Sequence, residues 1–233
     1  MLFRSRVQWQ ILWDTNEVLW YSQRDGTAQM YLFDLNSGQL KNKVTNGAGP
    51  VTRVAKIDQA TRTMWFDAVG KEKGQDPYFT HLYRVGLDGS GLARISRTEG
   101  THRAVFNPSF TNYIDVWSDA TTPTQVRLHR ADGSETRAID ANPVRALVDY
   151  RLSTPEFIEV KARDGFVMDA MIIKPPDFSP SKKYPVYQLT YAGPTMSSVR
   201  NSWGGTQYMY HQLLRSEEHT SELQSRFGIS YAV

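Results

Sequence analysis

Three similar units follow one another before residue 141, and this repeat constrains the fold more than any other feature of the chain. Each unit begins with an aromatic-rich stretch, at residues 18–22, 63–67 and 114–118. An alternating stretch follows a polar loop in each unit, at residues 29–33, 81–85 and 125–129. Each then meets a turn signal, Asn36-Ser37-Gly38, Asp88-Gly89-Ser90 or Asp132-Gly133-Ser134, before a further short stretch. Turns of this type between alternating stretches predict β-hairpins.

The period of the repeat predicts a β-propeller. It is roughly 45 to 50 residues, as expected for a four-stranded blade. One blade has two apolar faces and buries them only against neighbouring blades. We therefore expect a mainly β chain whose residues 1–141 form about three blades, the carboxyl-terminal part of a larger propeller. Aromatic residues of the repeat are expected to pack between blades, with ligand stacking as the alternative for any one of them: Trp20, Tyr21, Trp65, Phe66 and Trp117.

The pattern changes after residue 141. Asn142 and Pro143 suit the cap and first position of a short helix that continues to Tyr150, so residues 142–154 are expected to form a linker. Residues 156–162 and 166–173 alternate on either side of a turn signal and predict a β-hairpin. Two prolines, Pro175 and Pro176, end the second stretch.

A second, incomplete domain is expected over residues 155–214. Residues 184–190 form an apolar, β-branched run that predicts a buried strand, and this run leads into the loop Tyr191-Ala192-Gly193-Pro194. Residues 207–214 suit the start of a helix. Hairpin, strand, loop and helix in this order are typical of the entrance to an open α/β sheet, here the first strands of an α/β-hydrolase domain.

The last stretch, residues 215–233, is expected to be a non-native tail. Residues 215–225 read Arg-Ser-Glu-Glu-His-Thr-Ser-Glu-Leu-Gln-Ser, which is the in-frame translation of a widely used short-read sequencing adapter. The alternative is a polar helix. A segment of this origin does not belong to the fold. We therefore expect no metal site at the acidic residues and the histidine of the tail: Glu217, Glu218, His219 and Glu222.

Charge and composition exclude several classes. The formal net charge is +3 and the basic residues are dispersed, which argues against a nucleic-acid-binding face. The chain has no cysteine, so disulfides and cysteine-ligated metals are excluded. The sequence has neither a membrane-spanning run nor a signal segment after Met1. Both ends of the chain are expected to be truncated, so these features do not assign the protein to a cellular compartment.

A family resemblance rests on several motifs together. The propeller repeat, the predicted hairpin, the sequence Lys182-Lys183-Tyr184-Pro185-Val186, the Tyr191–Pro194 loop and Trp203-Gly204 resemble the dipeptidyl peptidase IV branch of the prolyl oligopeptidase family. Acylaminoacyl and prolyl tripeptidyl peptidases are close alternatives. The resemblance covers nearly everything before Arg215.

This resemblance implies a serine exopeptidase that cleaves peptides from their amino end, often after proline, with a Ser-Asp-His triad. It implies that Tyr191 donates its hydroxyl to the developing oxyanion, the alternative being a half-buried tyrosine at a strand end. It implies a peptide substrate and a homodimer for the parent protein. No cofactor, metal or nucleic acid is expected as a partner. Members are often periplasmic, secreted or membrane-anchored.

The triad itself is missing from this sequence. The nucleophile motif Gly-x-Ser-x-Gly does not occur, so the chain is expected to be an inactive fragment of the peptidase. The histidines outside the tail are expected to be structural or exposed: His81, His102, His129 and His211. The alternative is a non-catalytic propeller scaffold for interactions, although residues 155–205 would then be superfluous. A metal-dependent enzyme lacks a ligand cluster once the tail is removed.

Overall fold

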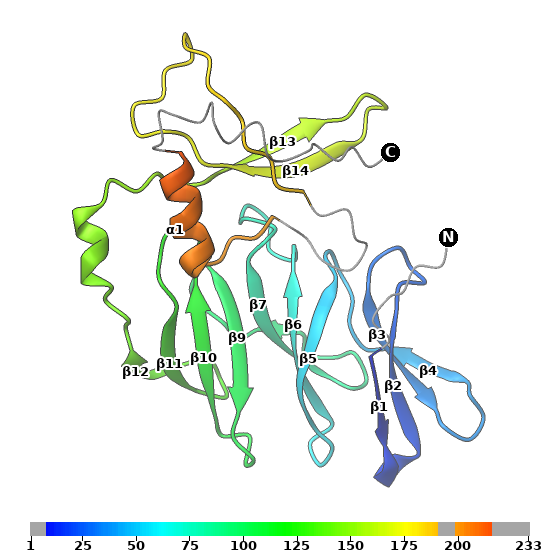
Figure 1. The fold of residues 1–233 in the computed structure, drawn as a ribbon. Helices are drawn as coiled ribbons and strands as arrows, with labels where there is room; N and C mark the ends of the chain where they lie inside the picture. Colours follow the sequence, from blue (N-terminus) through cyan, green and yellow to red (C-terminus); the bar gives the residue numbers. More distant parts are fainter. Residues whose placement is uncertain (1–7, 191–198, 216–233) are drawn as a thin grey trace.

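A computed structural model describes residues 8–190 and 199–215, and they form a mostly β structure (Figure 1). Three four-stranded antiparallel sheets follow one another along the chain, and in each the strands pair in sequence order. Blade 1 consists of β1 (Trp9–Leu12), β2 (Glu17–Ser22), β3 (Gln29–Asp34) and β4 (Leu40–Lys43). Blade 2 consists of β5 (Val51–Asp58), β6 (Thr63–Val69), β7 (Thr80–Gly86) and β8 (Ala93–Arg94). Blade 3 consists of β9 (Thr101–Phe106), β10 (Asn112–Ser118), β11 (Gln125–Arg130) and β12 (Glu135–Asp140).

The three predicted units and the mainly β fold are confirmed. The sequence pattern located the second, third and fourth strands of each blade but not the first. Those first strands, β1, β5 and β9, carry polar residues at several positions, and β5 is also broken by two irregularities in its pairing with β6. A short 3-10 helix, η1 (Trp13–Thr15), joins the first two strands of blade 1.

The same hydrogen-bonded turn recurs between the third and fourth strands of blades 2 and 3. In blade 3 the Asp132 carboxylate accepts hydrogen bonds from the backbone N–H and the hydroxyl of Ser134, at 2.8 and 2.6 Å. Asp88 binds Ser90 in the same way in blade 2. Gly133 lies at φ +87°, a left-handed conformation that glycine adopts without strain. The turn signals in the sequence therefore mark real hairpin turns.

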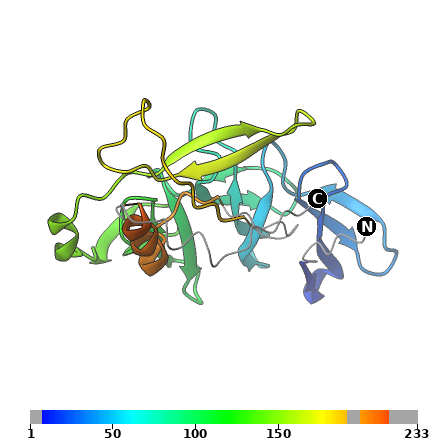
Figure 2. The ribbon, with the colours of Figure 1, turned by 45° about the horizontal axis from the view of Figure 1, so that its top comes forward.

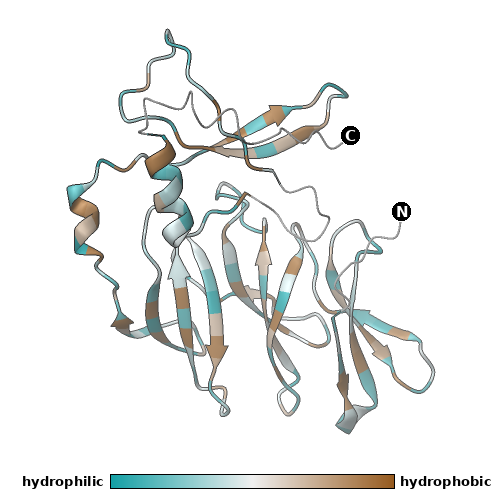
Figure 3. Cartoon of the chain, viewed as in Figure 1, coloured by the Kyte–Doolittle hydropathy of each residue, from teal (hydrophilic) through white to brown (hydrophobic). Residues whose placement is uncertain are grey.

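The cores lie between blades rather than within them. One cluster joins blade 1 to blade 2, and a second joins blade 2 to blade 3. Neighbouring residues of β6 serve both, since Phe66 belongs to the first cluster and Trp65 to the second. Hydrophobic and hydrophilic positions alternate along several strands, in keeping with this packing (Figure 3).

Two of the five aromatic residues expected between blades lie elsewhere. Trp20 is 38% exposed, because its position on β2 faces away from blade 2. Trp117 is half-buried, its indole N–H donates to the Glu99 carbonyl at 2.8 Å, and its ring lies under the Arg127 guanidinium. Tyr21, Trp65 and Phe66 pack in or against the cores as expected.

The C-terminal part lies across one end of the blades (Figures 1 and 2). It contains a 3-10 helix, η2 (Arg145–Asp149), a hairpin of β13 (Glu156–Lys161) and β14 (Val167–Ile172), and a helix, α1 (Gly205–Leu214). The predicted hairpin and helix are thus confirmed. No helix in the described part of the chain is long and apolar enough to cross a membrane.

Two sequence predictions for this part are wrong. Residues 184–190 form no strand, and Val186 is 85% exposed. A strand needs a neighbour for its backbone N–H and C=O groups, and no described strand pairs with this stretch. Asn142 does not cap a helix either: it adopts φ +43°, its amide donates to the Thr124 carbonyl at 2.9 Å, and η2 starts only at Arg145.

Candidate functional site

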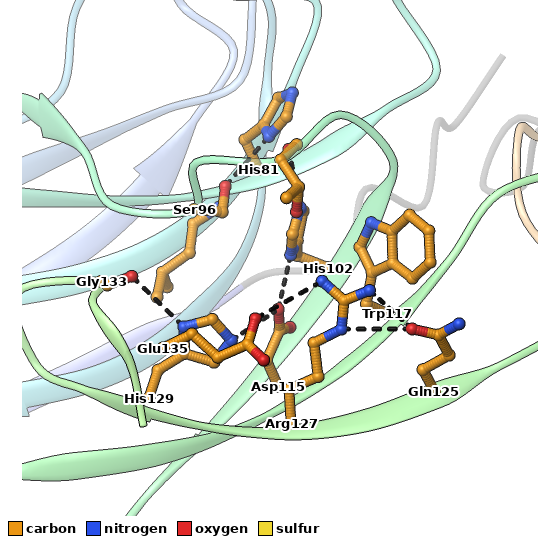
Figure 4. Close-up of polar contacts among 12 residues, drawn as sticks. His81, Ser96, His102, Asp115, Trp117, Gln125, Arg127, His129, Gly133 and Glu135 are labelled. Atoms are coloured by element: carbon orange, nitrogen blue, oxygen red, sulfur yellow. Dashed lines mark hydrogen bonds and ion pairs between the residues drawn. The ribbon is translucent and has the colours of Figure 1, made fainter. Parts of the chain in front are cut away.

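The predicted oxyanion donor, Tyr191, lies outside the described residues together with the rest of its loop. Two groups of polar side chains are candidates for a functional site among the described residues. One is a buried network between blades 2 and 3, and the other lies where the C-terminal part meets the ends of these blades. Figure 4 shows the network.

The centre of the network is a histidine–aspartate pair. His102 of β9 and Asp115 of β10 approach to 2.6 Å between Nδ1 and Oδ2, and both side chains are 2% exposed. The other ring nitrogen of His102, Nε2, faces the Thr98 carbonyl at 3.0 Å. The Thr98 hydroxyl also lies 3.4 Å from Nε2, so the His102 ring is held between Asp115 on one side and Thr98 on the other.

His81 of β7 lies beside this pair but bonds differently. Its ring centroid is 5.6 Å from that of His102. Burial, together with the nearby charge of His102, lowers the pKa of His81 to about 4, so this ring is neutral at pH 7. One nitrogen contacts the Ser96 hydroxyl at 2.9 Å, and the other contacts the Gln75 side-chain oxygen at 2.9 Å.

The Ser96–His81 pair is not arranged for nucleophilic catalysis. The Ser96 oxygen is buried and also accepts the Leu82 N–H at 3.1 Å, which leaves no space for a substrate carbonyl. A catalytic base needs a carboxylate or similar group to orient it, and His81 has an amide there instead. This geometry is that of a structural histidine, which agrees with the sequence-based interpretation.

The network continues within blade 3, from β10 to β11. His129 Nε2 lies 3.9 Å from the Asp115 carboxylate, and the His129 ring stacks on Tyr113 with centroids 5.1 Å apart. Arg127 lies over the Trp117 ring, 4.5 Å from its centroid, and donates to the Gln125 side chain. These contacts join the side chains of β10 to those of β11.

A second ion pair lies within blade 2, and its arginine also reaches blade 3. Arg53 of β5 donates to the Asp67 carboxylate at 2.7 Å and to the Ala104 carbonyl of β9 at 2.9 Å. Burial raises the pKa of Asp67 to about 6, although Arg53 acts in the opposite direction. The Arg53 guanidinium therefore links the two sheets, and its partner in blade 2 is a carboxyl group that burial drives toward its neutral form.

The C-terminal part contacts the blades through Asn201, whose side-chain amide donates to Asp76 at 2.6 Å.

The fourth histidine outside the tail, His211, lies on α1 with its ring 6.2 Å from that of Tyr210, and no described acid, base or nucleophile is paired with it. A cavity of about 480 Å³ lies beside the linker, where Lys174 and Glu156 pair at 2.6 Å. Within residues 8–190 and 199–215, no group of three or more histidine, cysteine, aspartate or glutamate side chains could hold a metal ion.

Three consecutive antiparallel blades, with their polar residues used to join sheets, define a propeller-type β region rather than a complete catalytic site. Residues 3–124, just over half of the chain, match the family model described as the dipeptidyl peptidase IV (DPP IV) N-terminal region. The chain belongs to this family.

Individual relatives agree with the family assignment. Dipeptidyl peptidase 4 of Arthroderma otae is 27% identical over 187 residues, covering 78% of this chain and 24% of the relative. Dipeptidyl peptidase 4 of Trichophyton equinum is 24% identical over 192 residues, covering 80% of this chain and 24% of the relative. The crystal structure of Porphyromonas gingivalis dipeptidyl peptidase 4 superposes with a TM-score of 0.75 at 30% identity, covering 86% of this chain and 28% of that protein. This chain thus spans about a quarter of the length of the curated relatives it matches.

Proposed function

We propose that this chain is part of a serine exopeptidase of the dipeptidyl peptidase IV kind, which removes short peptides from the amino end of a peptide substrate, often after proline. The observation that carries the proposal is the match of residues 3–124 to the dipeptidyl peptidase IV N-terminal region. The relatives named dipeptidyl peptidase 4 support it, because they align with about four fifths of the chain.

Residues 155–214 belong, in this proposal, to the start of an α/β-hydrolase domain. The alignments with relatives cannot be confined to the blades, since residues 1–141 are less than two thirds of the chain and the alignments cover 78% and 80% of it. The part after the blades therefore contributes to the similarity.

Tyr191 is the proposed oxyanion donor. A phenol hydroxyl is a neutral donor, and a preset donor at the position of a developing oxyanion lowers the barrier of acyl transfer by about 3 kcal/mol. Acceleration of this kind needs a nucleophile and a base, and the described Ser96–His81 pair is buried and misdirected for both roles. We therefore propose that the chain by itself does not hydrolyse peptides.

The test is a hydrolysis assay on the full chain. A chromogenic dipeptide anilide with proline in the second position is incubated with the chain, and a fluorophosphonate probe is applied in parallel to label any reactive serine. Dipeptidyl peptidase 4 of Porphyromonas gingivalis serves as the positive control. We expect neither anilide release nor labelling from this chain. Release that the fluorophosphonate abolishes would show an active serine here and contradict the proposed inactivity.

A further inference from the structure

The loop between β6 and β7, residues 70–79, meets the C-terminal part of the chain at the end of blade 2 (Figure 1). Asp76 in this loop uses its two carboxylate oxygens for different purposes. Oδ1 accepts the backbone N–H of Tyr78 at 2.8 Å, which holds the loop in a tight turn. Oδ2 accepts a hydrogen bond from the side-chain amide of Asn201 at 2.6 Å. Asp76 thus shapes the loop and also binds a residue far along the sequence.

Asn201 connects this loop to blade 3. Its side-chain oxygen accepts the backbone N–H of Ala120 at 3.0 Å, and its backbone carbonyl accepts the hydroxyl of Thr101 at 2.7 Å. The residue is only 9% exposed. Asp76 offers only an acceptor and Ala120 offers only a donor, so the side chain between them must donate at one end and accept at the other. An asparagine amide does both, whereas an aspartate of the same shape does not.

The stretch that begins at Asn201 is also fixed at its far end. The Gln212 side chain of α1 pairs with the backbone N–H and the carbonyl of Ser153, each at 2.9 Å. The Tyr208 hydroxyl donates to the same carbonyl at 2.9 Å. Residues 201–212 therefore bridge the ends of blades 2 and 3 and the linker, held at each end by a buried amide side chain.

The same loop contacts the hairpin. Tyr78 stacks on Phe157 of β13 with ring centroids 6.3 Å apart. Burial raises the pKa of the Tyr78 hydroxyl, and a hydrogen bond with Asp169 of β14 raises it further. Both pieces of the C-terminal part, the hairpin and the stretch beginning at Asn201, thus meet within a few residues of one loop.

We propose that the β6–β7 loop is the docking element that holds the domain after the blades in register with them, and that Asn201 is its positioning residue. The identity of that domain as a peptidase domain rests on the proposed function, but the docking does not. In the proposed peptidase, the docking would fix the chain ten positions after Tyr191 against two blades.

The test exchanges the donor and acceptor of the Asp76–Asn201 pair. Asn201→Asp places two carboxylates in contact, whereas the double variant Asp76→Asn with Asn201→Asp restores one hydrogen bond with its polarity reversed. Asn46→Asp makes the same charge change at an exposed position and is the matched control. Backbone hydrogen exchange of the full chain is measured by mass spectrometry at pH 7.

We expect peptides covering residues 199–215 to exchange about tenfold faster in Asn201→Asp, corresponding to roughly 1.4 kcal/mol of lost local stability. The strands of blade 1 should be unchanged, and the double variant should exchange as the wild type does. Wild-type exchange in Asn201→Asp, or a double variant as fast as the single one, would overturn the proposal. If Asn201→Asp does not fold, the double variant decides: wild-type exchange supports the docking, and failure to fold overturns it. No hydrolysis is measured, so this outcome is independent of the peptidase proposal.

Discussion

Arg62 binds Glu17 through both ends of its guanidinium group, at 2.8 and 3.2 Å, and so joins the turn between β5 and β6 of blade 2 to β2 of blade 1. Glu17 is 1% exposed and also accepts hydrogen bonds from Lys41 and Thr15. Burial by itself would raise the pKa of the Glu17 carboxyl, but the hydrogen bonds from Arg62, Lys41 and Thr15 lower it to about 2. A buried carboxylate is thus kept charged by partners from two blades.

Replacement of Glu17 by glutamine should destabilise the chain by about 2 kcal/mol at pH 7, because the charged hydrogen bonds to both basic partners are lost. The wild type should lose stability as the pH falls from about 4.5 to about 2, since the unfolded carboxyl takes up its proton before the folded one does. Urea unfolding at a series of pH values measures both effects. The glutamine variant should lack this acid-dependent component.

Asp14→Asn is the control for Glu17, because Asp14 is an exposed acid in the adjacent 3-10 helix. It should leave the midpoint of urea unfolding nearly unchanged. Equal losses in the Asp14 and Glu17 variants would show that net charge, rather than the Glu17–Arg62 contact, governs the effect.

Asp67 and His81 should give opposite pH dependences that partly cancel. The folded state holds a proton on Asp67 up to about pH 6, so its contribution to stability is lost as the pH rises from about 3.8 to about 6. His81 stays neutral down to about pH 4 in the folded state, so its contribution is lost as the pH falls from about 6.5 to about 4. Each group changes the free energy of unfolding by at most about 1.4 kcal/mol per pH unit.

Single variants separate the two groups. In Asp67→Asn, unfolding free energy measured between pH 4 and 6.5 should rise more steeply with pH than in the wild type. In His81→Gln, it should fall with rising pH over the same range. Unchanged slopes in both variants would mean that neither group titrates differently in the folded and unfolded states.

Replacement by alanine should destabilise the chain more at Gly133 than at Gly26, because only Gly133 lies against a neighbouring blade. Both lie at φ near +88°, so alanine costs about 1 kcal/mol at either position. At Gly133 the added Cβ would lie 2.2 Å from the Ile95 carbonyl of blade 2, whereas at Gly26 it would meet no atom within 4 Å. Gly133→Ala should therefore lower the unfolding free energy by about 2 kcal/mol more than Gly26→Ala. Equal losses in thermal or urea unfolding would show that blades 2 and 3 move apart without cost.

Phe66 and Trp20 test where the aromatic residues of the repeat contribute. Phe66 is fully buried between blades 1 and 2, and its replacement by alanine should cost about 3–5 kcal/mol. Trp20→Ala should cost about 1 kcal/mol or less, because the ring faces solvent for much of its area. Urea unfolding compares them directly. A larger loss at Trp20 would place its ring in a core that the structure does not show.

Local signals in the sequence were sufficient to predict the hairpins. The turns at Asp88 and Asp132 are specified by residues two positions apart, so they are legible without the fold. The first strand of each blade was missed because its pattern is set by contacts with other strands, as in Arg53 of β5, which reaches into blade 3.

The polar sites depend on residues that are distant in sequence. His81 and His102 come from different blades, and the Asp76–Asn201 contact joins residues 125 positions apart. Nothing in the local pattern marks these partners. At residues 184–190 the local pattern was misleading instead. The composition favours a strand, but a strand forms only beside a neighbouring strand that pairs with it.

The most direct test of the proposed peptidase origin is to amplify and sequence the source locus across the codons for Leu213, Leu214 and Arg215. We expect the reading frame to continue after Leu214 into hydrolase sequence with a Gly-x-Ser-x-Gly motif, followed by an aspartate and a histidine. A genomic sequence that encodes residues 215–233 as they stand and then stops would contradict it, and a non-catalytic propeller scaffold would become the function to test.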